Sequence, residues 1–102
     1  MIELIERHRP AIEAICRNRH VLRLEVFGSA TGRHFDPKRS DVDFLVEFVK
    51  DRPLDLVDAY FGLHEDLERL LGRPVDLVMT SAIKNPFFLE SVNESRQTVY
   101  AA

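Results

Sequence analysis

Apolar and polar residues follow two different periods along the chain, and the places where the period changes divide it into elements. Residues 2–19 carry apolar side chains at helical spacing, with Pro10 either restarting the helix or kinking a longer one. Residues 21–27 alternate apolar and charged side chains, which is typical of a strand with one buried face. The polar residues 30–40 predict a short helical turn and a loop. Residues 42–48, rich in Val, Leu and Phe, then predict a second, largely buried strand.

The second half of the chain continues with a helix, a strand, a helix and a short edge strand. These elements are predicted over residues 56–71, 75–79, 87–93 and 98–100. Gly72 ends the first of these helices, because glycine readily adopts the left-handed conformation found after a helix. Asn85 followed by Pro86 marks the start of the second, as an N-cap and a first helical residue. The order of elements favours a small α/β (α+β) sandwich, a mixed sheet flanked by helices, in a single domain over residues 1–102.

The composition is that of a globular protein, with 45% apolar and 30% charged residues. No apolar run reaches the ~20 residues that span a bilayer, so we expect no membrane association. The single cysteine, Cys16, cannot form an internal disulfide and lies in an apolar helical pattern, which favours a buried thiol in a cytoplasmic protein. The net charge of −3, without a long basic run, argues against a dedicated nucleic-acid surface.

Acidic residues stand where strands ordinarily disfavour them. Asp41 and Asp43 lie at the head of the second predicted strand, and residues two apart on a strand point to the same face. Neighbouring carboxylates repel each other, and Mg²⁺, which prefers oxygen ligands, relieves that repulsion. Asp76 is a third acid inside an apolar run, so three carboxylates converge if the third strand lies beside the second. Such a cluster can hold two Mg²⁺ ions for in-line attack on a phosphate.

Gly28-Ser29 directly follows the first predicted strand and offers a cradle for phosphate. Glycine lets the backbone approach a phosphate closely, and exposed N–H groups and the serine hydroxyl can bind its oxygens. Each feature alone has a plainer interpretation. Gly28-Ser29 is then a turn that ends a strand, and the aspartates are polar residues at strand starts. The combination, in this order and spacing, indicates a nucleotide site.

The stretch from FGS through DVDFLVEF to VDLV resembles the minimal nucleotidyltransferase (MNT) family of the DNA polymerase β superfamily. That family's pattern is Gly-Ser, a spacer, Asp-x-Asp and a third acid on a following strand. The spacer here, residues 30–40, has eleven residues, one more than the usual pattern, and a loop tolerates the insertion. The resemblance implies a polymerase-β-like fold, ATP as substrate and two Mg²⁺ ions. The residues that it implies are Asp41, Asp43 and Asp76 as catalytic metal ligands, and Gly28 and Ser29 as ligands of the β- and γ-phosphates. Lys38 and Arg39 lie in the spacer, where they would neutralise phosphate charge.

The same resemblance implies a protein partner. Minimal nucleotidyltransferases pair with HEPN-domain proteins in modules that resemble toxin–antitoxin pairs. The nucleotidyltransferase is the antitoxin, and it transfers AMP from ATP to a tyrosine hydroxyl of the HEPN ribonuclease. A chain without an acceptor domain fits a protein acceptor.

Two alternatives stay open: an inactive antitoxin that neutralises its HEPN partner by contact, and a nucleotidyltransferase that acts on a small molecule. The apolar run Phe87, Phe88 and Leu89 is expected to pack in the core, but in the first alternative it would form the contact surface. Tyr60 and Phe61 present the same choice, because two adjacent helical residues cannot easily face one core.

Overall fold

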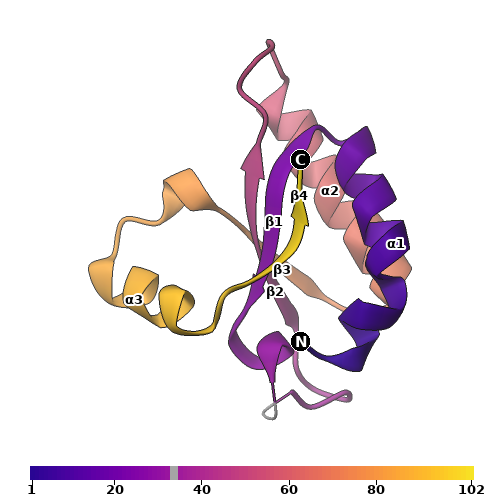
Figure 1. Ribbon diagram of the computed structural model, residues 1–102, viewed down its shortest axis with the longest axis vertical. Coiled ribbons are helices and arrows are strands. Elements are labelled where there is room, and N and C mark those ends of the chain that lie inside the picture. Colours follow the sequence, from indigo (N-terminus) through magenta and orange to yellow (C-terminus); the bar gives the residue numbers. More distant parts are fainter. Residues whose placement is uncertain (33–34) are drawn as a thin grey trace.

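The computed structural model describes residues 1–32 and 35–102, and residues 33 and 34 of the predicted loop lie outside the described part. Its sheet has helices on both faces (Figure 1). The elements in chain order are α1 (Glu3–Asn18), β1 (Val21–Phe27), the 3₁₀ turn η1 (Gly28–Thr31), β2 (Val42–Phe48), α2 (Leu56–Leu71), β3 (Val75–Met79), the 3₁₀ turn η2 (Thr80–Ala82), α3 (Pro86–Ser95) and β4 (Gln97–Ala101).

The four strands form one mixed sheet in the order β3-β2-β1-β4. β1 pairs antiparallel with both β2 and β4, and β2 pairs parallel with β3. The parallel pair needs a crossover connection, which α2 provides. The predicted α+β sandwich with a small mixed sheet is therefore confirmed, and the last predicted strand is present as β4.

The two faces of the sheet are covered unequally. α1 and α2 lie on one face and α3 on the other, as Figure 1 shows at the right and the left of the sheet. Alternate residues of β2, among them Val42, Phe44 and Val46, belong to the larger core under α1 and α2. A smaller apolar cluster on the α3 side contains Phe27, Leu45 and Val92. The polar residues of β2 that alternate with the larger core therefore face α3.

Pro10 lies inside α1, which runs without a break from Glu3 to Asn18. The helix is thus a single long one, and the alternative of a restart at Pro10 is wrong. An interior proline costs a helix about 3 kcal/mol, because it removes one hydrogen bond and crowds the preceding turn. Here the ring is exposed to solvent, and Ile5, Ile12 and Cys16 are fully buried on either side of it. Tertiary packing of this apolar face holds the helix together across the proline.

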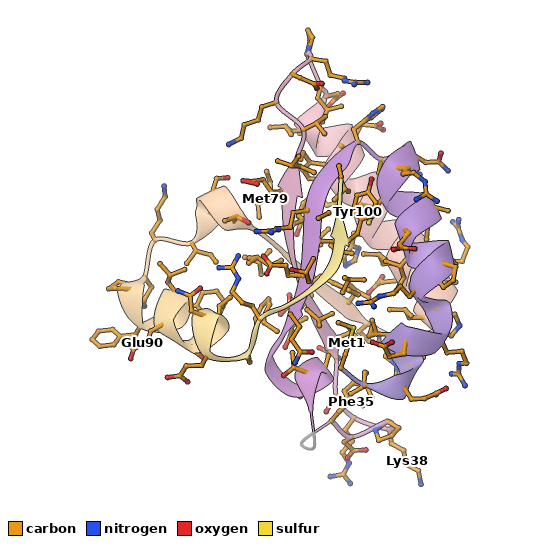
Figure 2. All side chains as sticks on the ribbon, viewed as in Figure 1. Met1, Phe35, Lys38, Met79, Glu90 and Tyr100 are labelled. Atoms are coloured by element: carbon orange, nitrogen blue, oxygen red, sulfur yellow. The ribbon has the colours of Figure 1, made fainter. Side chains whose placement is uncertain are left out.

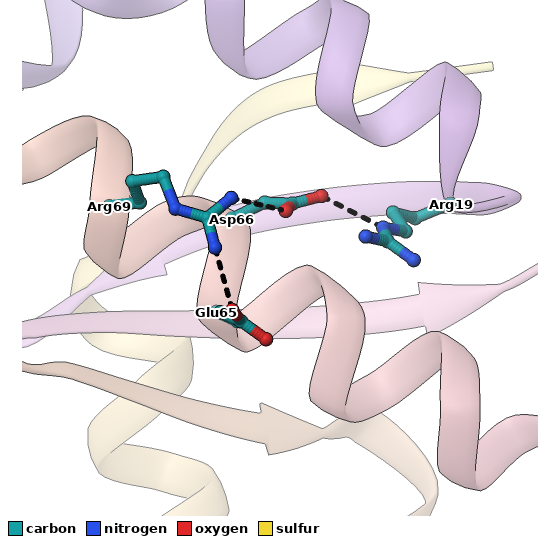
Figure 3. Close-up of polar contacts among 4 residues, drawn as sticks. All are labelled: Arg19, Glu65, Asp66 and Arg69. Carbon is teal, nitrogen blue, oxygen red and sulfur yellow. Dashed lines mark hydrogen bonds and ion pairs between the residues drawn. The ribbon is translucent and has the colours of Figure 1, made fainter.

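A network of charged side chains joins the end of α1 to α2 (Figure 3). Arg19 donates to a carboxylate oxygen of Asp66 at 2.8 Å, and Arg69 pairs with both Glu65 and Asp66. A Cβ on Gly62 would lie 2.4 Å from Nη1 of Arg19, so glycine makes room for this guanidinium against α2. The two helices are thereby fixed to each other on one face of the sheet.

Within residues 1–32 and 35–102, no helix combines the length and the apolar character needed to cross a membrane.

The short helix α3 leaves apolar side chains exposed. Asn85 caps its start by accepting from the Phe87 N–H at 2.9 Å, as the sequence predicts. The Phe87 side chain is 80% exposed, so the expectation that it packs in the core is wrong; α3 places only Val92 fully in the core. Phe88 packs edge to face against Phe27, with 6.0 Å between the ring centroids. On α2, Tyr60 is half-buried while Phe61 is exposed, as expected for adjacent helical residues.

Candidate active site

The parallel pairing of β2 and β3 places two acidic residues side by side. Asp43 is the register partner of Asp76, next to the pair Val42 and Val75. The two valines are buried, Asp43 is half-buried and Asp76 is exposed. Because alternate residues of a strand point to opposite faces, both carboxylates lie on the face that carries α3. The expected adjacency of the third strand to the second is confirmed.

The residues directly before β2, from Phe35 onward, are tied to the start of β3, which places Asp41. The Arg73 guanidinium lies over the Phe35 ring, 5.0 Å from its centroid, and donates to the Ser40 carbonyl at 3.4 Å. One residue later, the Pro74 carbonyl accepts from the Val42 N–H at 3.2 Å. These contacts tie the end of the loop to the start of β3. Asp41 is exposed at this junction, two residues from Asp43.

Negative charge accumulates at Asp43. Burial, together with the nearby carboxylates of Asp76 and Asp41, raises the pKa of the Asp43 carboxyl to about 6. A carboxyl that resists ionisation beside two other acids is unfavourable for the fold and typical of functional sites. The contributions of Asp76 and Asp41 to this pKa indicate that all three acids act on one region of space.

Gly28 brings the Gly-Ser turn against this acidic region. Its neighbour Phe27 is the register partner of Asp43 across β1 and β2, so the turn begins next to the carboxylate. Gly28 has φ +68°, a conformation that residues with a side chain rarely adopt. A Cβ at this position would lie 3.0 Å from an Asp43 carboxylate oxygen. Glycine is therefore required here both for the turn and for its close approach to Asp43.

Hydrogen bonds fix the turn after Gly28. The Thr31 hydroxyl donates to the Gly28 carbonyl at 2.7 Å, and the Gly32 N–H donates to the Ser29 carbonyl at 3.3 Å. Ser29 itself is half-buried. The turn thus follows directly on β1, and the two parts of the site that the sequence indicates, the Gly-Ser turn and the acids, lie together.

Lys38 and Arg39 lie in the loop that precedes β2, and both are exposed. Their backbone N–H groups bond to Asp36, to its carboxylate and its carbonyl respectively. Figure 2 shows Lys38 at the outer edge of the molecule, away from the strands. Their role beside a phosphate stays a prediction.

The donor set fits a hard divalent cation in its chemistry, since it consists of carboxylate oxygens. Among residues 1–32 and 35–102, no group of three or more His, Cys, Asp or Glu side chains is already spaced to hold a metal ion. A bound cation would therefore have to draw the carboxylates of Asp41, Asp43 and Asp76 closer together. The raised pKa of Asp43 shows what such a cation would relieve.

A hollow of about 330 Å³ lies between the Gly-Ser turn and α3. Its lining includes Gly28, Ser29, Thr31, Gly32, Ser91, Glu94 and Ser95. The residues from α3 are absent from the sequence-based prediction. The Ser95 hydroxyl accepts from the Gly28 N–H at 2.9 Å, across 67 positions of sequence. No local pattern signals a contact over this separation, because it depends on how α3 packs on the sheet.

A larger hollow, of about 500 Å³, lies at the other end of β2. Its lining is mostly apolar and includes Phe48, Leu54 and Met79. Asp41, Asp43 and Asp76 are not among its lining residues. These acids do not line the smaller hollow either, but Gly28, which does, lies directly against the Asp43 carboxylate. We therefore assign the chemistry to the Gly-Ser turn and the acids beside it.

Comparison with known proteins agrees with this geometry. Residues 9–99 match the nucleotidyltransferase domain family. Two proteins of Methanocaldococcus jannaschii that bear the name protein adenylyltransferase are 35% and 30% identical to this chain, each over 90% of this chain and 87% of the relative. The solved structure of a minimal nucleotidyltransferase superposes with a TM-score of 0.70 at 29% identity, covering 94% of this chain and 95% of the other.

More distant structures share the fold. One holds a tri-AMPylated HEPN toxin of Shewanella oneidensis in complex with an MNT antitoxin, with a TM-score of 0.65 at 19% identity, covering 96% of this chain and 73% of the other. Another is a toxin–antitoxin structure with AMP-PNP, with a TM-score of 0.67 at 22% identity, covering 92% and 73%. The family match covers most of the chain, and the 35% identical relative is matched over most of its own length. The chain therefore belongs to the nucleotidyltransferase domain family and is an enzyme of nucleotidyl transfer.

Proposed function

We propose that this chain is a Mg²⁺-dependent protein adenylyltransferase of the cytoplasm. It transfers AMP from ATP to a hydroxyl of a HEPN-domain partner and acts as the antitoxin of that pair. The observation that carries the proposal is the juxtaposition of Asp43 and Asp76 on adjacent strands, with Gly28 against the Asp43 carboxylate. Two acids beside a phosphate-accessible turn form the arrangement that phosphoryl chemistry requires.

The places of the residues in the fold support the roles that we propose for them. Asp41, Asp43 and Asp76 would hold two Mg²⁺ ions, which, when bound, neutralise the charge that develops on the phosphate oxygens. Ser29, through its hydroxyl and backbone N–H, would bind the β- and γ-phosphates, and Gly28 keeps the turn open for them. Lys38 and Arg39 would add positive charge from the loop that ends at Asp41.

The transfer is a single displacement at the α-phosphorus. The acceptor oxygen forms a bond to that phosphorus, and the bond from phosphorus to the bridging oxygen of the β-phosphate breaks. Pyrophosphate leaves with the bonding electron pair. The hydroxyl proton passes to a carboxylate at the site. We assign this role to Asp76, because it is exposed and lies on β3, at the edge of the sheet.

The choice of a protein acceptor is supported by relatives. Proteins with 35% and 30% identity bear the name protein adenylyltransferase. An MNT antitoxin of the same fold is seen in complex with an AMPylated HEPN toxin. The exposed Phe87 side chain offers an apolar contact for a protein partner. This exposure also favours the second candidate function, inhibition of the partner by contact alone.

Intact mass spectrometry tests the proposal. The chain is mixed with a HEPN-domain protein from the same genome, Mg²⁺ and ATP, and the double variant Asp41→Asn/Asp43→Asn serves as the matched control. The expected result is a gain of one or more AMP units on the partner that is absent with the variant. No gain, while a stable complex still forms and inhibits the partner, would favour the contact inhibitor.

A further inference from the structure

The helix α3 is anchored to the sheet by an ion pair with a buried carboxylate. Glu25 on β1 is only 6% exposed, and Arg96, directly after α3, donates to both of its carboxylate oxygens at 2.6 and 3.1 Å. The same guanidinium donates to the Asn93 side chain at 2.8 Å. A two-point contact between a guanidinium and a carboxylate restricts orientation as well as distance. The last turn of α3 therefore has a defined position over the sheet.

Ser95 precedes Arg96 and points into the hollow beside the Gly-Ser turn. Its hydroxyl oxygen accepts from the Gly28 N–H at 2.9 Å, a normal hydrogen-bond distance. The anchor of α3 is thus one residue away from the contact with the turn. Ser91, one helical turn earlier, lines the same hollow, but the Gly28 N–H bonds to Ser95.

Gly28 is the residue on which the geometry of the turn depends. Gly28 has a positive φ, and on the side that faces Asp43 its backbone has little room to move. Glycine has the largest conformational freedom of any residue, so a contact from outside the turn adds to the restraint that its internal hydrogen bonds give. The Ser95 hydroxyl supplies it from the side of α3.

We propose that Ser95 is a positioning residue for nucleotide binding: its hydroxyl, held by the anchored end of α3, fixes the Gly28 N–H and thereby the Gly-Ser turn against Asp43. The inference rests on the proposed role of this turn as the phosphate cradle. In this arrangement the Gly28 N–H belongs to the scaffold, and Ser29 supplies the donors to the phosphates. A preorganised turn binds phosphate more tightly, because less conformational entropy is lost on binding.

The opposite role for Ser95 is a competitor that occupies a donor meant for phosphate. The two roles predict opposite changes in the Kd for nucleotide when the Ser95 hydroxyl is removed. If Ser95 positions the turn, its removal weakens nucleotide binding. If Ser95 competes with phosphate, its removal strengthens binding.

The experiment measures the Kd of Mg²⁺·AMP-PNP for the full chain by isothermal titration calorimetry. Ser95→Ala is compared with Ser91→Ala, a matched control on the same helix and hollow, and with Ser95→Thr, which keeps the hydroxyl. We expect Ser95→Ala to raise Kd about fivefold, the change that corresponds to the ~1 kcal/mol of one neutral hydrogen bond. Ser91→Ala and Ser95→Thr should stay near the wild-type value. Amide hydrogen exchange at Gly28 should become faster in Ser95→Ala, while the thermal midpoint Tm stays close to that of the wild type.

Each result decides the question. An unchanged or lower Kd in Ser95→Ala, with wild-type Tm, would overturn the inference and leave adenylyl transfer untouched. A wild-type chain that binds AMP-PNP but modifies no partner would overturn the proposed acceptor and leave the role of Ser95 standing. A wild-type chain that binds no nucleotide would overturn both.

Discussion

Asp43 and Asp76 are register partners on the parallel strands β2 and β3, and both project from the face that carries α3. The pairing places two carboxylates on neighbouring strands, where Asp43 is half-buried. Burial and the charges of Asp76 and Asp41 raise the pKa of Asp43 to about 6. Without a cation, this pair works against the stability of the fold that supports it. Substitutions at the site should therefore change the stability of the protein as well as its activity.

Replacement of Asp43 by Asn should stabilise the metal-free protein at neutral pH. The folded-state pKa lies above the ordinary value of 3.8, so the folded state keeps the proton longer than the unfolded state. The free energy of unfolding then falls as pH rises from 3.8 to about 6, and the full penalty is present at pH 7.5. We expect Asp43→Asn to gain about 1 kcal/mol, less than the whole shift because Asp43 is partly exposed, or roughly 4–8 °C in Tm with EDTA present.

With Mg²⁺ present, the wild type should become more stable than Asp43→Asn. An ion that binds only the folded state raises its stability by mass action, and the variant lacks one of the proposed ligands. Asp41→Asn removes an exposed acid and should change the metal-free Tm less than Asp43→Asn does. A metal-free Asp43→Asn protein that melts below the wild type at pH 7.5 would show that the carboxylate is stabilising as it stands.

Replacement of Gly28 by Ala should reduce both stability and activity. An alanine would have to adopt φ +68° and to place its Cβ 3.0 Å from the Asp43 carboxylate. The left-handed conformation alone costs about 1–2 kcal/mol, and a shift of the turn that relieves the contact misplaces the phosphate cradle. We expect a loss of about 1–3 kcal/mol in urea unfolding and of roughly 10- to 100-fold in kcat/KM for adenylyl transfer.

Variants at two other glycines separate the effect of the positive φ from that of the contact with Asp43. Gly32, at the far side of the same turn, has an extended φ, and a Cβ there meets nothing within 4 Å, so Gly32→Ala should behave as the wild type. Gly72 shares the positive φ, but a Cβ there also meets nothing, so Gly72→Ala should lose stability and keep its activity. Equal activity losses in Gly28→Ala and Gly72→Ala would exclude the contact with Asp43 as the cause.

Most of the fold can be predicted from local sequence, because most elements show a hydrophobic period of their own. The strands over 21–27, 42–48 and 75–79 and the helix over 56–71 have the predicted bounds. The alternation around Asp43 and the lone acid Asp76 also predict the site, once the third strand is taken to lie beside the second. These predictions succeed because they rest on periods and on residue types that a strand ordinarily excludes.

The remaining features depend on contacts that no local pattern encodes. α1 continues through Pro10 because buried residues on both sides of the proline hold it against the sheet. Phe87 resembles a core residue in sequence but is exposed, because α3 is short and covers little of its face of the sheet. Ser95 lies 67 positions from Gly28, and nothing in its own neighbourhood predicts their hydrogen bond.

Cys16 should be unreactive in the folded protein. Burial raises the pKa of its thiol to about 12, from an ordinary 9.0, so the nucleophilic thiolate is scarce at pH 8. Alkylation by iodoacetamide at pH 8, followed by mass spectrometry, should be slow in buffer and fast in denaturant. The same shift has a consequence for stability. Above pH 9 the unfolded thiol loses its proton while the folded one keeps it, so the free energy of unfolding falls as pH rises further.

A Cys16→Ala variant provides the control for the pH effect. It loses stability at every pH, because the buried position, 0% exposed, is left with a cavity. Between pH 9 and 10.5, however, its free energy of unfolding should fall less steeply than that of the wild type. Parallel slopes for the two proteins would mean that another group titrates in this range. Rapid alkylation of the native wild type at pH 8 would show that the thiol is accessible.

The two ion pairs of Arg96 and Arg19 should differ in their effect on stability, because the burial of their partners differs. Arg96→Ala leaves the carboxylate of Glu25, whose side chain is 8% exposed, without its partner, and an unpaired buried charge costs about 3–5 kcal/mol. Arg19→Ala breaks its 2.8 Å contact with Asp66, but Asp66 is 21% exposed at its side chain and keeps Arg69 nearby, so about 1 kcal/mol or less is expected.

The double variant Glu25→Gln/Arg96→Gln tests the explanation of this difference. If the loss in Arg96→Ala arises from the stranded charge, neutralising both partners should recover at least half of it in urea unfolding. If it arises instead from lost packing of α3, the double variant should be as unstable as the single one. The measurement also bears on the nucleotide site. Any variant that frees the end of α3 should weaken AMP-PNP binding in proportion to the loss of the Ser95 contact, whereas Arg19→Ala, on the opposite face of the sheet, should leave binding unchanged.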